Sequence, residues 1–81
     1  MITKKDVVCL EENLEKAFPE KTNEERKKML DSLVNYPGAD TAFITIVNGN
    51  ITRIGVKAED KSRCVRKLYF VTEHFSEWMD D

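Results

Sequence analysis

The sequence predicts one α+β domain in the order helix, helix, β-hairpin, helix, with a two-stranded antiparallel sheet packed on the helices. Three observations predict this class. Apolar residues recur at helical spacing in residues 3–18, 22–34 and 60–79, β-branched residues dominate 42–47 and 51–56, and an Asn-Gly pair separates those two runs. The chain has 81 residues, which suits one domain over 1–81 and not two.

The first predicted helix begins after Thr3, and Asp6 stands three residues later, at the spacing of a capping box. Pro19 ends the helix, because the residue before a proline is disfavoured in α geometry. The apolar face of this helix consists of Val7, Leu10, Leu14, Ala17 and Phe18.

The second predicted helix begins after Thr22, where Glu25 completes a capping box. The run from Asn35 to Gly38 contains Pro37 and ends the helix. Its apolar face consists of Met29, Leu30, Leu33 and Val34.

The hairpin over 42–56 allows two registers. A two-residue turn at Asn48-Gly49 would pair Ile44 with Arg53 and place the arginine on an apolar face. We favour a three-residue loop over 48–50, because it leaves one clean buried face. That register pairs Ala42 with Val56, Ile44 with Ile54 and Ile46 with Thr52. The opposite face then carries Phe43, Thr45, Val47, Ile51 and Arg53.

The third predicted helix begins near Asp60 or Ser62 and continues to about Met79. Its apolar stripe repeats at intervals of four, three, four and three residues, through Cys64, Leu68, Val71, Phe75 and Trp78. Two strands alone make a marginal sheet. We therefore expect a dimer mate or a binding partner at the sheet, or a further strand from residues 36–41 or the N-terminus.

Composition excludes several classes of protein. The net charge is −2, from 13 basic and 15 acidic residues, which excludes a basic nucleic-acid coat over the whole molecule and an acidic DNA mimic. No apolar run approaches the roughly 18 residues needed to cross a bilayer. The N-terminus has no secretory pattern, so we expect a cytoplasmic protein.

The sequence offers few groups for catalysis, and it predicts neither an enzyme nor a cofactor or metal. Cys9, Cys64 and the single histidine, His74, have no zinc-binding spacing. Cys64 falls on the predicted apolar stripe, and Cys9 falls off the apolar face of its helix. The three glycines are isolated and make no phosphate-binding loop.

The candidate binding surface lies on the back of the predicted third helix. Phe70 falls almost opposite the apolar stripe, among cations, and an exposed aromatic residue in that setting is typical of an interface. The alternative is that Phe70 packs beneath another segment of the same chain. The predicted partner-binding residues are Arg53, Arg63, Arg66, Lys67, Phe70 and His74.

The sequence therefore predicts a small non-catalytic protein–protein interaction module, an adaptor or inhibitor of a larger complex. Products of phages and mobile elements that block a host system are often of this size and kind. The alternative is a nucleic-acid-binding module that uses the basic segment Arg53–Lys67, with Phe70 as a stacking platform. A homodimer through the hairpin edge is compatible with both.

Overall fold

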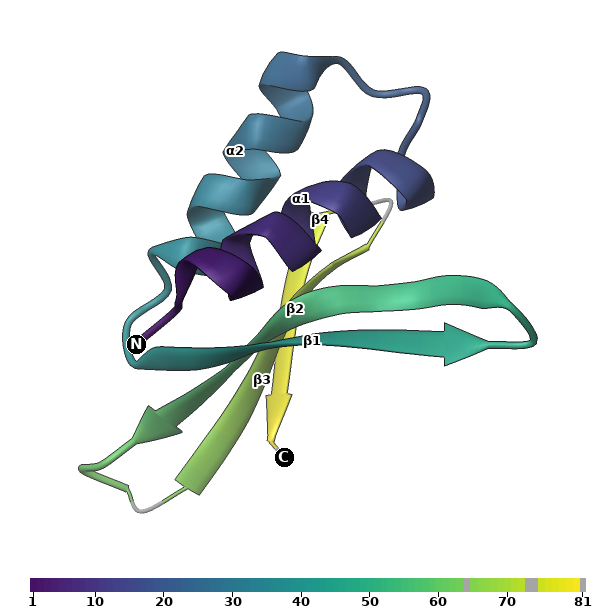
Figure 1. Cartoon of the computed structure of the whole chain (residues 1–81). Coiled ribbons are helices and arrows are strands. Elements are labelled where there is room, and N and C mark those ends of the chain that lie inside the picture. The colour runs from purple at the N-terminus through teal and green to yellow at the C-terminus, as the bar shows by residue number, and fades with distance from the viewer. Residues whose placement is uncertain (64, 73–74, 81) are drawn as a thin grey trace.

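The structure, a computed structural model, describes residues 1–63, 65–72 and 75–80. Two helices are followed by a four-stranded antiparallel sheet in the order β1-β2-β3-β4, so each strand pairs with its neighbour in sequence (Figure 1). The elements are α1 (Lys4–Ala17), α2 (Asn23–Val34), β1 (Ala39–Val47), β2 (Asn50–Asp60), β3 (Val65–Thr72) and β4 (Phe75–Asp80). The predicted α+β class is confirmed, whereas the predicted order of elements and the two-stranded sheet are wrong.

Both predicted capping boxes are confirmed, and they set where α1 and α2 begin. The backbone N–H of Asp6 donates to Thr3 Oγ1 over 3.2 Å, and that of Glu25 donates to Thr22 Oγ1 over 3.1 Å. Each acidic side chain accepts a bond in return from the backbone N–H of its capping threonine. These bonds satisfy donors that the first turn of a helix leaves without partners. Helix α1 ends at Ala17, and Phe18, the residue before Pro19, is its C-cap with non-helical backbone angles, as the proline predicts.

The predicted third helix over 60–79 is wrong, because most of the described residues of that range lie in β3 and β4. In β3, Tyr69 and Val71 turn toward the helices, while Leu68 and Phe70 fall on the other side of the sheet. A strand with apolar residues on both faces supplies apolar positions three and four apart, which imitates a helical stripe. Strand β4 pairs with β3 so that Tyr69 lies opposite Trp78.

The β1–β2 hairpin combines the two registers that the sequence allows. Ala42 pairs with Val56 and Ile44 with Ile54, as predicted. The predicted three-residue loop and the pairing of Ile46 with Thr52 are wrong, because Ile46 pairs with Ile51.

A two-residue turn closes this hairpin, and a bulge keeps Arg53 out of the core. Asn48 and Gly49 both have positive φ, of 51° and 78°, as a type I′ turn requires. Thr52 is the extra residue of a β-bulge between the Thr45–Arg53 and Ile46–Ile51 pairs. The bulge moves Ile51 to the core side, so the prediction that Ile51 shares a face with Arg53 is wrong.

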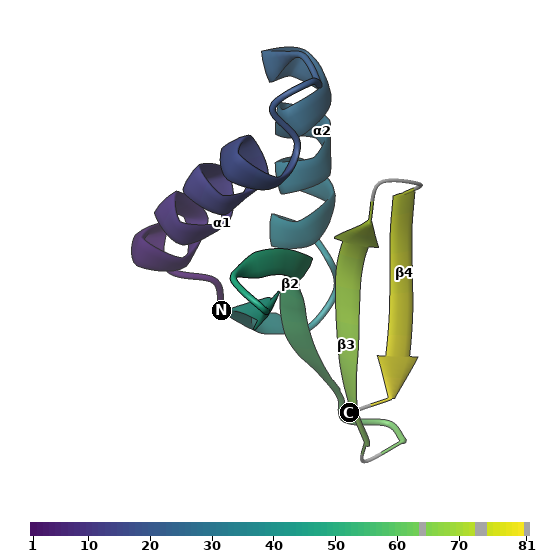
Figure 2. The same cartoon turned by 90° about the vertical axis from the view of Figure 1, so that its right-hand side faces the viewer.

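The molecule has two layers, with both helices on one face of the twisted sheet (Figure 2). The core lies between the layers. Its buried members are Leu10, Leu14, Phe18, Leu33, Ile54, Val56 and Val71. Of the helices in the described part of the chain, none combines the length and apolarity that a membrane span needs.

Candidate functional site

The face of the sheet turned away from the helices is here called the open face. Strand alternation and register define it, since residues two apart in a strand share a face. No helix lies over it in Figures 1 and 2. Its described residues include Thr41, Phe43, Thr45 and Val47 in β1, Arg53, Gly55, Lys57 and Glu59 in β2, and Arg66, Leu68 and Phe70 in β3.

Phe70 lies at the centre of the open face and is buried, with only 5% of its surface exposed. The prediction of an exposed Phe70 on an outer helix face is therefore wrong. Its partner in β2 is Gly55, and a Cβ on Gly55 would lie 2.7 Å from Cβ of Phe70 and in collision with the Tyr69 carbonyl oxygen. Glycine therefore permits the close approach of β2 and β3 that buries Phe70.

Arg53 lies over the exposed side of Phe70. The guanidinium carbon stands 5.1 Å from the centre of the ring, within the range of a cation–π contact. Arg53 pairs with Thr45 across the β1–β2 ladder and remains exposed. The sequence thus identified two residues that do meet, but the arginine covers the ring of Phe70 and leaves little of it to a partner.

The other predicted site residues do not form one surface. Arg66 shares the open face with Phe70 and makes an ion pair with Asp40 at 3.6 Å. Lys67 follows it in the strand and therefore points to the opposite, helix-covered side. Arg63 is exposed in the turn between β2 and β3, and His74 lies outside the described residues. The grouping of Arg66 and Lys67 on one side of Phe70 depended on a helix and is wrong.

The two most exposed large apolar residues of the described strands lie instead at the end of the β1–β2 hairpin. Ile46 is 62% exposed and Val47 is 50% exposed. This end of the hairpin extends beyond the helices, which cover only the other part of the sheet (Figure 1). The sequence placed Val47 on the face opposite the core and predicted a partner at the sheet, but it named neither Ile46 nor Val47 among the binding residues. The position of both residues beside the Asn-Gly turn was the available signal.

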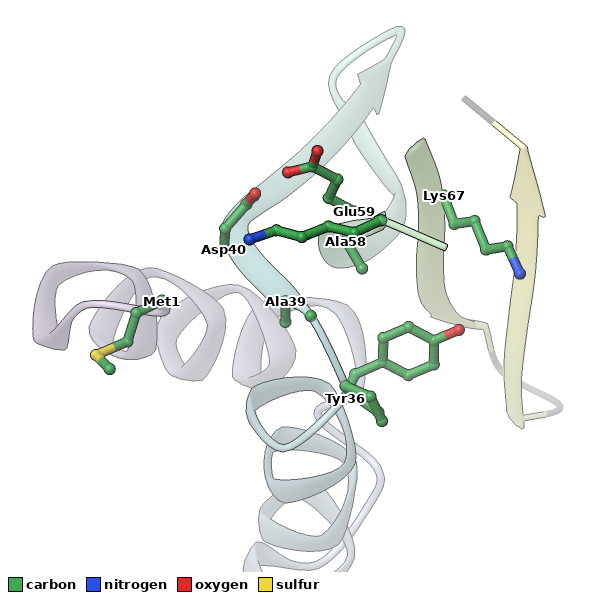
Figure 3. A pocket seen from close by; sticks show the side chains of 10 residues that line it. Met1, Tyr36, Ala39, Asp40, Ala58, Glu59 and Lys67 are labelled. Carbon is green, nitrogen blue, oxygen red and sulfur yellow. The ribbon is translucent and has the colours of Figure 1, made fainter. Parts of the chain in front are cut away.

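A groove of about 750 Å³ lies where the α2–β1 connection meets β2 and β3. Tyr36 lines this groove and stacks on Tyr69, with the two ring centres 4.3 Å apart. Asp40 and Glu59 stand on one side of the groove and Lys67 on the other (Figure 3). The described core contains no buried polar or charged side chain. The groove therefore carries charged side chains of both signs on its rim.

Glu25 and Cys9 illustrate the local contacts of titratable side chains in the two helices. The backbone N–H of Thr22 donates to the Glu25 carboxylate over 2.9 Å, and this bond holds the pKa of Glu25 below its ordinary value of 4.5. Cys9 is a half-buried free thiol beside Asn13, whose amide donates to the Cys9 carbonyl. No set of three or more His, Cys, Asp or Glu side chains in the described ranges is placed to hold a metal ion.

No protein-family model, curated protein or solved structure matches this chain.

Proposed function

We propose that this chain is a non-catalytic protein-binding module, an adaptor or inhibitor that attaches to a larger protein through the open face at the hairpin end. The observation that carries the proposal is the exposure of Val47 on a sheet face that no helix covers. Val47 continues the row of half-buried Phe43 along the strand, and apolar surface exposed on an uncovered sheet face marks a candidate interaction site.

The surroundings of Val47 match the composition of an interface. Half-buried Phe43 and Thr45 lie behind it in the same strand and on the same face. Arg53 stands opposite Thr45 and is held in place by its contact with the Phe70 ring. Aromatic residues and arginine are enriched where proteins bind, and an arginine already ordered by a ring loses less entropy on binding.

The proposal is tested by two matched substitutions. Val47 and Val8 have almost equal exposures of 50% and 51%, but Val8 lies on α1, away from the open face. Affinity purification from a native lysate, followed by titration of the purified partner, should give strong binding for the wild type and for Val8→Asp. Val47→Asp should weaken it at least about tenfold, or 1.4 kcal/mol. Equal binding by the two variants would contradict the proposal.

A nucleic-acid-binding module is the second candidate, because Arg53, Lys57 and Arg66 share the open face. Two observations weigh against it: Phe70 is buried and covered by Arg53, and Arg66 is paired with Asp40. If this candidate is correct, binding of single-stranded nucleic acid weakens steeply with salt, and Arg53→Glu abolishes it. The absence of binding at low salt would eliminate it.

A further inference from the structure

Strand β1 forms one edge of the sheet, and its outer side has the properties of a pairing surface. Within the described residues, no strand lies beyond β1. The Thr52 hydroxyl donates to the Thr45 carbonyl over 3.3 Å, so this carbonyl points toward β2. Because the N–H and C=O of one residue in a strand point to the same side and alternate along it, those of Ala42, Ile44 and Ile46 point outward.

The edge lacks the features that usually prevent pairing. Residues Thr41 to Val47 include no charged residue, proline or glycine. Natural edge strands are commonly protected by lysine, proline or a bulge within the strand. Here one register shift falls near Asp40, before this stretch, and the other is the bulge at Thr52 in β2, the strand inside the edge. The stretch from Thr41 to Val47 is thus a continuous, uncharged edge.

We infer that β1 pairs with β1 of a second copy of this chain, antiparallel and about a two-fold axis at Ile44. In that register Ile44 faces its own copy, and Ala42 faces Ile46 of the partner subunit through outward-pointing backbone groups. Phe43 faces Thr45 of the partner subunit on the open face. An interface between identical strands must be self-complementary, and this register meets that condition.

The charges and exposures fit a second copy. No like charges face one another within the paired stretch, and Asp40 falls opposite the neutral Asn48 of the partner subunit. The net charge of −2 gives little repulsion between copies. Ile46, which is exposed in one chain, gains an apolar neighbour, and the row of Ala42 and Ile44 extends the helix-covered side of the sheet across the axis.

Hydrogen exchange and sedimentation over a range of concentrations test the dimer. At high concentration the chain should sediment as a dimer, with the amides of Ala42, Ile44 and Ile46 protected. On dilution these three amides should lose protection, while those of Phe43 and Thr45, which face β2, keep it. A monomer at every concentration, with fast exchange at the three outward amides, would overturn the inference.

Two proline substitutions separate the edge from the fold. Ile46→Pro removes an outward N–H, so it should weaken the dimer about tenfold or more, because two symmetry-related bonds are lost, and leave the thermal unfolding of the monomer nearly unchanged. Val47→Pro removes an N–H that faces β2 and should instead lower the stability of the monomer. A dimer that Ile46→Pro does not weaken would place the contact elsewhere and overturn the inference.

The same measurements separate self-pairing from capture of a foreign strand. If the outward amides become protected only when another protein is added, the second copy is the wrong occupant. If the chain does not pair with itself, the partner-binding test with Val47→Asp and Val8→Asp still stands. The dimer inference and the proposed function can therefore fail independently.

Discussion

The two faces of the sheet bury aromatic and aliphatic side chains by different means. On the covered face, Leu10 and Leu33 of the helices meet Ile54 and Val56 in an apolar core between two layers. On the open face, Phe70 is almost as well hidden without a second layer, by the close strand at Gly55 and by Arg53 above the ring. The comparison shows that the central aromatic side chain of this sheet face is buried from solvent although no helix lies over it. The exposed apolar surface of the open face is then found at the end of the β1–β2 hairpin, at Val47.

The largest expected effect compares the same substitution on the two faces. Leu10→Ala leaves a cavity between the layers and should lower the free energy of unfolding by about 3 kcal/mol. Leu68→Ala on the open face removes a half-buried side chain whose space water can fill, and should cost about 1 kcal/mol. Urea unfolding of both variants measures the difference. Equal costs would mean that the open face is as well packed as the covered one.

The next effect concerns how the open face is sealed. Gly55→Ala places a methyl group against the backbone of Tyr69 and Phe70, and should cost about 2 kcal/mol. Gly49→Ala is the control, because nothing lies within 4 Å of its added Cβ and only the positive φ is strained, which should cost about 1 kcal/mol. Thermal unfolding distinguishes them. A Gly55→Ala variant as stable as the wild type would contradict the close approach.

A smaller effect is the coupling of Arg53 to Phe70. A double-mutant cycle with Arg53→Met and Phe70→Leu should give a coupling free energy of about 0.5–1 kcal/mol, as expected for a partly exposed cation–π pair. Denaturation of the four proteins measures it. A coupling of zero would mean that the arginine covers the ring without stabilising it.

The smallest effect belongs to the helical layer and depends on pH. The pKa of Glu25 is lower in the folded chain than its ordinary 4.5, so the unfolded chain binds the proton first as the pH falls. The stabilising contribution is therefore present above about pH 4.5 and is lost as the pH falls through the folded pKa. Glu25→Gln should remove this part of the pH dependence. Parallel stability curves for the two proteins below pH 5 would contradict it.

The sequence was most informative where the local signals agreed. Threonine caps, proline stops and apolar periodicity all indicated the same boundaries for α1 and α2, and the Asn-Gly pair located the turn. The bulge at Thr52 was not predictable from either simple register. The bulge allows Ile51 and Ile54 to point into the core while Arg53 points to the other face. This requirement becomes visible only when the sheet is packed on the helices.

In the segment after Asp60 the signals disagreed, and the wrong one was preferred. Five of the eight residues of β3 are β-branched or aromatic: Val65, Tyr69, Phe70, Val71 and Thr72. Cations near the start and acids near the end of the predicted helix also opposed its dipole, which was evidence against a helix. The predicted surface around Phe70 depended on that helix and is wrong with it. Arg53 and Phe70 nevertheless lie in contact, because the register of β2 and β3 brings them together.

The order of strands in the sheet has a consequence for how the chain reaches this state. Every ladder joins consecutive segments through a short connection, so no distant parts of the chain must find one another before a ladder can form. Chains in which contacting residues are close in sequence tend to fold fast. Stopped-flow refolding should therefore give a single rapid phase, with the β1–β2 turn as a natural starting point.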